Sequence, residues 1–333
     1  MPDLSRANEL MRALAKTNKY ISPVTLDDFK LFNSFFKKEP HSYGNSWVYI
    51  TQGVYGIGPN NLGYKYYDGD NLSIIIMYPR LEEQDTIMTY WVRPMGPKIT
   101  EKIVEVAKSI YELFDINSYV KKIYKSQFEE LEKSGFISSD KHPWHSFSHA
   151  EDDTYPEMIL DVSGSLEKTH TAGKKKNIKR SYKESIKFAK SNKIEVNEID
   201  FKENAWKITN DFFRDRAKYQ SKPNLSNPGD YFNPIYSNDM NKALTRRLFW
   251  VNGEPKGYYL LEKMNEKYSS VYALISDRIS YQYLNDFILI DILQNSPTPY
   301  INLGGSEDIG IHNFKKKYKP VEENQMYWAY SNL

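Results

Sequence analysis

The apolar and polar positions of this chain follow two periods, and each change of period marks an expected element. Residues 99–114 place apolar side chains every three or four positions, which predicts an amphipathic helix. Residues 62–78 and 86–92 are rich in β-branched and aromatic residues, which predicts a hairpin with an Asp-Gly turn and a third strand after it. Residues 46–56 have a similar composition and predict one more strand.

The same order of predicted elements occurs again in the second half of the chain. Residues 246–264 predict a hairpin with an Asn-Gly turn, and a strand at 268–276 and a helix at 283–295 follow it. The turn glycines, Gly69 and Gly253, are 184 residues apart (253 − 69 = 184), and the later elements keep nearly the same offset. A tandem duplication of one α+β unit is the preferred interpretation, although hairpin, strand and helix in succession are common.

A basic segment lies between the two halves. The apolar residues at 178, 182, 186 and 189 fall on one face of a predicted helix, and lysines occupy the other faces. The basic residues could contact an RNA backbone or a coenzyme phosphate, or could form only a solvated face. They are Lys174, Lys175, Lys176, Lys179 and Arg180. The expected domains are therefore 1–160 and 196–333, with 161–195 as the connecting basic segment.

The composition limits the classes of function that remain. Of the 333 residues, 40% are hydrophobic and 26% are charged, as in an ordinary globular protein. The net charge of +2 excludes strong steering of the whole protein toward nucleic acid, so such binding would need a local patch. The absence of cysteine excludes disulfides, thiolate metal ligands and a cysteine nucleophile. With neither a signal peptide nor an apolar run of membrane-spanning length, we expect a cytoplasmic protein.

Three stretches of the chain resemble a known family. The first is NLGG at 302–305, followed by G-I-x-x-F-K-x-K-Y-x-P at 310–320 and a last strand that contains Tyr and Trp. The others are the strand, turn and helix at 91–112 and the connection at 154–180. In this order they resemble the soluble catalytic domain of the phosphatidylglycerol lysyltransferases and, more broadly, the Fem aminoacyl transferases.

That resemblance implies an α+β fold of two tandem GNAT-like domains, each a mostly antiparallel mixed sheet with flanking helices, joined by the basic helix. It also implies an acyltransferase that moves an acyl or aminoacyl group to an amine of a small molecule, lipid or peptide. Acyl-coenzyme A (acyl-CoA) or aminoacyl-tRNA would be the co-substrate, tRNA a possible partner, and no cofactor would be bound permanently. The alternative is a non-catalytic ligand- or RNA-binding protein on the same fold.

The stretch 300–320 contains the candidate catalytic residues. Acyl transfer to an amine needs a neutral amine, a polarised carbonyl and close positioning of the two. Glu307 or Asp308 could accept the amine proton, and Lys315 could stabilise the oxyanion. Tyr318 could donate a proton to the leaving group. The alternative interpretation is a glycine bend followed by a solvated, lysine-rich helix.

The candidate donor-binding residues lie at strand ends in both repeats. Glycines there let a ligand approach the backbone, and charged side chains could bind its phosphates. The second repeat has SDRISYQYLN in place of the glycine-rich turn with which simple GNAT enzymes hold coenzyme A, and the first keeps a partial version. The residues are Gly304, Gly305, Lys317, Asp277 and Arg278 in the second repeat, and Arg93 and Gly96 in the first.

A cluster of histidines and acids has spacing that a metal site could use. It consists of His142, His145, His149, Asp152 and Asp153. Pro143 interrupts it and favours a loop, so we expect no metal site there.

Overall fold

The computed structural model describes residues 4–38, 42–51, 63–79, 87–138, 155–164, 176–219, 228–237, 244–306 and 309–331. The chain forms two compact units, each with its own sheet. Unit 1 comprises Met1–Glu157, Gly305–Ile309 and Asn324–Leu333, and unit 2 comprises Met158–Gly304 and Gly310–Glu323.

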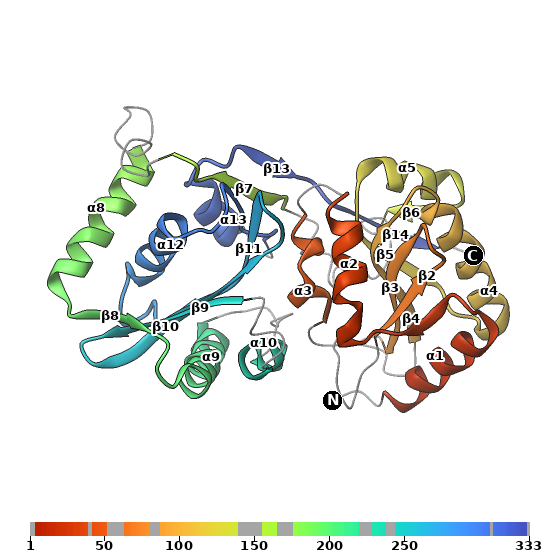
Figure 1. The fold of residues 1–333 in the computed structure, drawn as a ribbon, viewed down its shortest axis with the longest axis horizontal. Coiled ribbons are helices and arrows are strands. Elements are labelled where there is room, and N and C mark those ends of the chain that lie inside the picture. The colour runs from red at the N-terminus through yellow and green to blue at the C-terminus, as the bar shows by residue number, and fades with distance from the viewer. Residues whose placement is uncertain are drawn as a thin grey trace. The chain divides into compact units, whose positions relative to one another are not determined.

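Unit 1 is a seven-stranded sheet with helices on both faces (Figure 1). The strand order is β1-β2-β3-β4-β5-β14-β6, in which only β4 and β5 are parallel among the pairs with a described register. Its elements are α1 (Ser5–Thr17), β1 (Ile21–Pro23), α2 (Phe29–Phe36), α3 (Trp47–Thr51), β2 (Tyr64–Tyr67), β3 (Leu72–Pro79), β4 (Ile87–Met95), α4 (Ile99–Phe114), β5 (Ser118–Ile123), α5 (Lys125–Lys133), β6 (Phe136–Ser138) and β14 (Tyr327–Ser331).

Unit 2 is built on the same plan. Its strand order is β13-β7-β12-β11-β10-β9-β8, and β11 and β12 form its parallel pair. Its elements are β7 (Glu157–Asp161), α8 (Lys176–Ser191), β8 (Ile194–Asn197), α9 (Phe201–Tyr219), α10 (Phe232–Tyr236), β9 (Leu244–Val251), β10 (Glu254–Lys263), β11 (Tyr268–Ser276), α12 (Leu284–Gln294), β12 (Tyr300–Asn302), α13 (Ile309–Lys316) and β13 (Glu322–Asn324).

The two units repeat one another element by element, which confirms the predicted duplication. Read from the other edge, the second sheet is β8-β9-β10-β11-β12-β7-β13, the order of β1-β2-β3-β4-β5-β14-β6. In both units a helix connects the two parallel strands, α4 in unit 1 and α12 in unit 2. The expected α+β fold with two mostly antiparallel mixed sheets and flanking helices is therefore correct.

The two units exchange one strand each. β7 follows the elements of unit 1 in the chain but pairs with β12 in the second sheet. β14 follows the elements of unit 2 but pairs with both β5 and β6 in the first sheet. The compact units therefore do not follow the expected domain bounds: 158–195 belongs to unit 2, and Gly305–Ile309 and the last strand belong to unit 1.

Both hairpins form where the sequence predicts them, by different turn chemistry. Asn252 (φ 54°) and Gly253 (φ 87°) are both left-handed, as a two-residue type I′ turn requires. In the first hairpin the Asp68 carboxylate accepts the N–H groups of Asp70 and Asn71. A side chain thus closes the longer turn, in which Gly69 has φ 105°.

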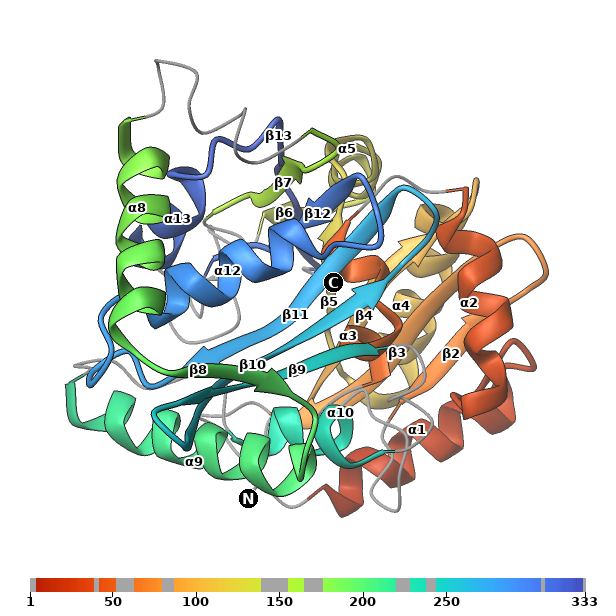
Figure 2. The same ribbon diagram turned by 60° about the vertical axis from the view of Figure 1, so that its left-hand side comes forward.

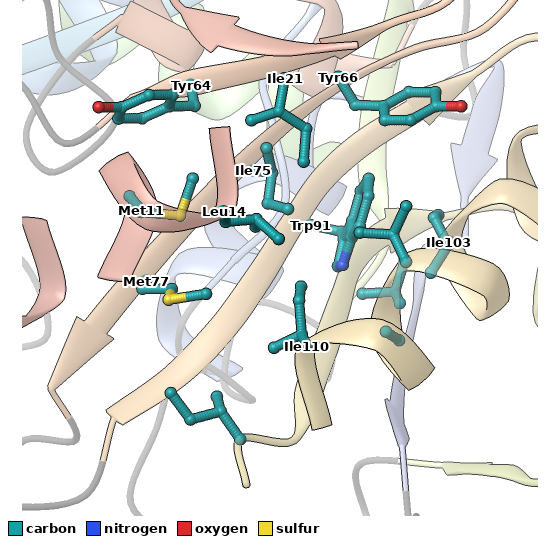
Figure 3. Packing of buried hydrophobic residues seen from close by; sticks show 14 of the residues in the cluster. Met11, Leu14, Ile21, Tyr64, Tyr66, Ile75, Met77, Trp91, Ile103 and Ile110 are labelled. Carbon is teal, nitrogen blue, oxygen red and sulfur yellow. The ribbon is translucent and has the colours of Figure 1, made fainter. Parts of the chain in front are cut away.

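Adjacent residues of a strand face opposite sides of a sheet, and this places the helices of unit 1. Tyr66 belongs to the core that α1 and α4 cover, where Trp91 is fully buried against them (Figure 3). The next residue, Tyr67, meets Phe35 of α2 on the other side of the sheet, where α3 also lies (Figure 1). Each large side chain buried in this way stabilises the fold by about 1.5–3 kcal/mol.

The same alternation divides unit 2. Tyr259 belongs to the core beneath α12, whereas Tyr258 meets Phe201 and Thr209 of α9. Figure 2 shows α9 and α12 on opposite sides of the strands β9 to β11. α13 also contributes to the α12 side, because Phe314 packs against that core.

Two local predictions need correction. The part of 46–56 that the structure describes forms α3 instead of a strand, because the Ser46 hydroxyl caps the helix by accepting the Tyr49 N–H. In α8 Ser185 is buried and Phe188 contacts Phe287 of α12, whereas Ile186, expected in the apolar face, is 38% exposed. In α8 tertiary contacts therefore prevail over the local apolar pattern, whereas α3 begins at a local cap.

The exchange of β14 predicts that shortening the C-terminus unfolds part of unit 1. Trp328 and Ala329 are buried in that strand, and β5 and β6 both use its backbone groups. In a chain ending at Gln325, hydrogen exchange should therefore lose protection at β5 and β6 and keep it at β9 and β10. A chain ending at Ser331 is the control, and unchanged protection of β5 and β6 in the shorter chain would contradict the role of β14.

Candidate functional site

The side chain of Lys315 is fixed at the end of β12. It lies on α13, and its Nζ donates a hydrogen bond to the carbonyl oxygen of Gly304 at 3.1 Å. Gly304 has φ 71°, and its own N–H donates to Oδ1 of Asn302 at 2.7 Å. The bend after β12 is thus held from two sides, and it positions a half-buried ammonium group.

The parallel strands β11 and β12 separate close to this bend. They pair only from Tyr268 with Tyr300 to Ser270 with Asn302, whereas β11 continues to Ser276. Along the rest of β11 the described ladder is with β10 alone. An extended ligand can hydrogen-bond to such a strand edge, and backbone N–H groups there can stabilise an oxyanion.

The other residues of the lysine cluster point elsewhere. Lys316 is exposed and pairs with Glu323 at 3.5 Å. Lys317 and Tyr318 both donate to the buried Asp286 of α12, at 2.5 and 2.6 Å. Burial, reinforced by the charge of Asp286, raises the pKa of Tyr318 above its usual range, so this hydroxyl stays protonated. Lys317 and Tyr318 thus connect α12 with the end of α13 inside unit 2.

The carboxylates proposed as proton acceptors, Glu307 and Asp308, lie outside the described residues, so their role stays a prediction. The chain just before them is packed, whereas Ile309, just after them, is 55% exposed. Gly305 is half-buried, and Ser306 is buried and forms a β-bridge with Tyr155.

Asp277 organises the turn between β11 and α12. Its side chain accepts the N–H of Ser280 at 2.9 Å, and its carbonyl accepts the N–H of Tyr281 at 3.1 Å. The N–H of Arg278 donates to Ser276 at 2.9 Å. In a glycine-rich turn the corresponding amides bind phosphate. Here these three amides are used by the turn itself.

A cavity of about 810 Å³ opens on the α9 side of unit 2. Its walls are α9, the start of β10 and the residues that follow β11. Arg278, which was predicted from the sequence, lines it together with Lys207 and Lys256, which were not. Lys207 and Lys256 could not be recognised in the sequence, because single lysines on a helix and a strand have no distinctive spacing.

The matching positions of unit 1 serve its own packing. Arg93 is 1% exposed, and its guanidinium donates to Asn45 at 2.5 Å and Tyr124 at 2.7 Å. Gly96 has φ 114°, and a Cβ there would lie 2.4 Å from the carbonyl oxygen of Asp70. Asp277, Arg93 and Gly96 thus stabilise turns, whereas the exposed side chain of Arg278 lines the cavity.

Only part of the basic segment can be placed. Lys174 and Lys175 lie outside the described residues, whereas Lys176 and Lys179 belong to the start of α8. Arg180 is exposed, and the exposed face of α8 continues through residues that the sequence prediction did not include. These are Lys183, Lys187 and Lys190.

The expectation of no metal site at the histidine cluster stays a prediction, because residues 142–153 lie outside the described ranges. Within those ranges no group of three or more acids and histidines could hold a metal ion. The described helices include none that is both long and apolar enough to cross a bilayer.

Comparisons with known proteins define the class of fold. The chain is similar to the C-terminal DUF2156 domain of an Agrobacterium fabrum protein assigned as a lysylphosphatidylglycerol synthetase, with a TM-score of 0.61, 10% identity and 93% of each chain covered. FemX gives a TM-score of 0.56 at 12% identity, over 94% of this chain and 97% of FemX. A tandem GNAT protein from the clavulanic acid biosynthesis pathway gives 0.50 at 8%, over 93% and 97%.

No protein-family model and no curated protein sequence matches the chain. The likeness is therefore one of fold. Together with the two sheets of identical strand order, it defines a tandem GNAT-like fold.

The geometry predicts that Gly96→Ala destabilises unit 1 whether or not a ligand is present. Left-handed strain costs about 1–2 kcal/mol, and overpacking against the first hairpin costs roughly 1–3 kcal/mol more. Gly69→Ala is the matched control, because Gly69 is also left-handed but has no atom within 4 Å of the new Cβ. Thermal unfolding measures the effect. An equal fall in the melting temperature of both variants would contradict the packing role of Gly96.

The contacts of Tyr318 predict that Tyr318→Phe lowers stability rather than catalysis. Removing the hydroxyl takes one hydrogen bond from the buried Asp286, which should lower the free energy of unfolding by about 1–3 kcal/mol. Tyr300→Phe is the control, because the Tyr300 ring stacks on Tyr268 and its hydroxyl has no hydrogen bond within the described part of the chain. A stable Tyr318→Phe protein with a large loss of kcat would instead support a role in proton transfer.

Proposed function

We propose that this protein is an acyltransferase whose reaction takes place in unit 2 and that Lys315 stabilises the transition state. The observation that carries the proposal is the hydrogen bond from Lys315 Nζ to Gly304, which fixes one ammonium at the end of β12. Lys315 is also the lysine of the F-K-x-K-Y motif on which the family resemblance depends. The tandem GNAT-like fold supports the same class of reaction.

The reaction forms one bond and breaks one. The nitrogen of a neutral amine attacks the carbonyl carbon of the donor, and the carbonyl oxygen becomes an oxyanion near the Lys315 ammonium. The bond from carbon to the leaving oxygen or sulfur then breaks, and the leaving group takes a proton. The amine proton passes to a base, for which Glu307 and Asp308 remain the candidates, and the base returns this proton to the leaving group. Losing one donor to an oxyanion typically costs about 10²–10³-fold in kcat.

We infer an aminoacyl-tRNA rather than an acyl-CoA as donor. Coenzyme A needs a phosphate cradle at the turn after β11, and three amides of that turn already donate within it. A tRNA needs an exposed basic surface, and α8 offers Arg180, Lys183 and Lys190 on its exposed side. The acceptor would be the amine of a small molecule, lipid or peptide.

A donor comparison tests the proposal. The purified protein is incubated with a panel of amines and with either radiolabelled aminoacyl-tRNAs or acyl-CoA thioesters. Transfer of label from tRNA to an amine is the expected result. Thiol release from acyl-CoA would overturn the choice of donor and keep the reaction class. Binding of tRNA without transfer to any amine would favour a non-catalytic RNA-binding protein.

Substitution of Lys315 tests its role within the reaction. Lys315→Ala should lower kcat/KM by at least about 10²-fold, because the oxyanion loses a charged donor. Lys316→Ala is the control, since that neighbour points to solvent and pairs with Glu323. Equal, small effects of the two substitutions would mean that the lysines of α13 form only a solvated surface.

A further inference from the structure

We propose that the cavity on the α9 side of unit 2 is a second ligand site and that it binds a phosphate monoester carried on a flat, apolar body. The cavity measures about 810 Å³, which lies within the ordinary range for small-molecule sites. Every residue that lines it belongs to unit 2. The site lies apart from the proposed acyl-transfer site, so it does not depend on the proposed reaction.

The two sites lie on opposite faces of the second sheet. The cavity is lined by α9, which packs on the Tyr258 side of the strands. α13 carries Lys315 and packs on the other side, with the core beneath α12. The cavity wall also comes from the start of β10 and the loop after β11, and it includes no residue of β12 or α13.

Apolar groups line one part of the cavity. Ile208 is buried, and Phe212 and Pro255 also line the cavity. Ile279 is 58% exposed although it borders the cavity. An exposed isoleucine and an aromatic ring that line one cavity offer a surface that an apolar ligand body would cover.

The charges of the lining favour an anion, because its carboxylates already have partners. Asp211 pairs with Arg214 at 2.8 Å, and Asp215 pairs with Lys218, which lies outside the cavity, at 2.9 Å.

Lys256 pairs with both remaining acids, Glu254 at 2.8 Å and Asp277 at 3.7 Å. Lys207 and Arg278 also line the cavity, and neither forms an ion pair with a described residue. Lys207 acts on Glu254 only beyond ion-pair distance. Two positive charges without a carboxylate in ion-pair contact match a phosphate monoester, which carries a charge of about −1.5 to −2 at neutral pH.

Arg278 joins the charged and the apolar parts of the cavity. Its guanidinium carbon lies 5.9 Å from the centre of the Phe212 ring. Its backbone N–H donates to Ser276, which fixes the start of the loop that carries it. A guanidinium held near an aromatic ring can bind two oxygens of a phosphate while the ligand body lies against Phe212 and Ile279.

Direct binding of phenyl phosphate tests the proposal. Phenol and inorganic phosphate, the two halves of this probe, are titrated separately as controls. Titration calorimetry should show saturable binding of phenyl phosphate, with a Kd below about 1 mM, and weaker binding of each half. A Lys207→Gln, Arg278→Gln double variant should weaken binding at least about tenfold. Both side chains are exposed, so the variant should fold normally, and its melting temperature checks this.

Lys267→Gln is the matched control, since it removes an exposed positive charge of unit 2 outside the cavity. The proposal is overturned if phenyl phosphate does not bind saturably, if phenol binds as well as phenyl phosphate, or if the double variant binds as well as the control.

Two further titrations separate this site from the donor site. Lys315→Ala should bind phenyl phosphate as the unaltered protein does, because the residue lies on the other face of the sheet. Coenzyme A and a short RNA ending in CCA should fail to displace the probe. Displacement by either one would assign the cavity to the donor and overturn the claim of a second site. Failure of acyl transfer itself would leave this binding result unchanged.

Discussion

The two sheets and the candidate site depend on the backbone hydrogen bonds of two exchanged strands, β7 and β14. β5 and β12 each pair in parallel with one neighbour and need a partner on the other edge, since unpaired backbone groups inside a fold are costly. β14 supplies that partner in unit 1, and β7 supplies it in unit 2. Each sheet is therefore completed by a strand that follows the other unit's elements in the chain: β7 follows those of unit 1, and β14 follows those of unit 2. The bend that holds Lys315 directly follows β12, so the candidate site depends on this pairing as well.

The two repeats keep one plan and use its turns differently. In unit 1 the positions that match a donor site hold a buried arginine and a glycine packed against the first hairpin. Lys122 has φ 59° at the end of β5, where unit 2 has Gly304 with φ 71° at the end of β12. Left-handed backbone is costly for a lysine and easy for glycine, so the bend in unit 2 is the less strained one. This asymmetry favours unit 2 as the site of the reaction.

Local signals account for what could be predicted from the sequence. The Asp-Gly and Asn-Gly turns, the amphipathic α4 and the common offset were sufficient to infer the duplication and the α+β fold. The strand exchange has no local signal, because β7 and β14 read as ordinary short strands whose partners lie far away in the chain. The same limit applies to the site. Lys315 was found through its motif, whereas the partners of Asp286 and the cavity lysines arise only from tertiary packing.

The central claim is that a positive charge at position 315 stabilises the transition state. Because the chain contains no cysteine, Lys315→Cys introduces a single thiol that can be alkylated selectively with 2-bromoethylamine. The product carries an ammonium group on a side chain of nearly the length of lysine. The account predicts that Lys315→Cys loses at least about 10²-fold in the rate of acyl transfer and that aminoethylation restores most of it. Full activity of the unmodified cysteine variant, or no recovery after complete alkylation of a folded protein, would contradict the account.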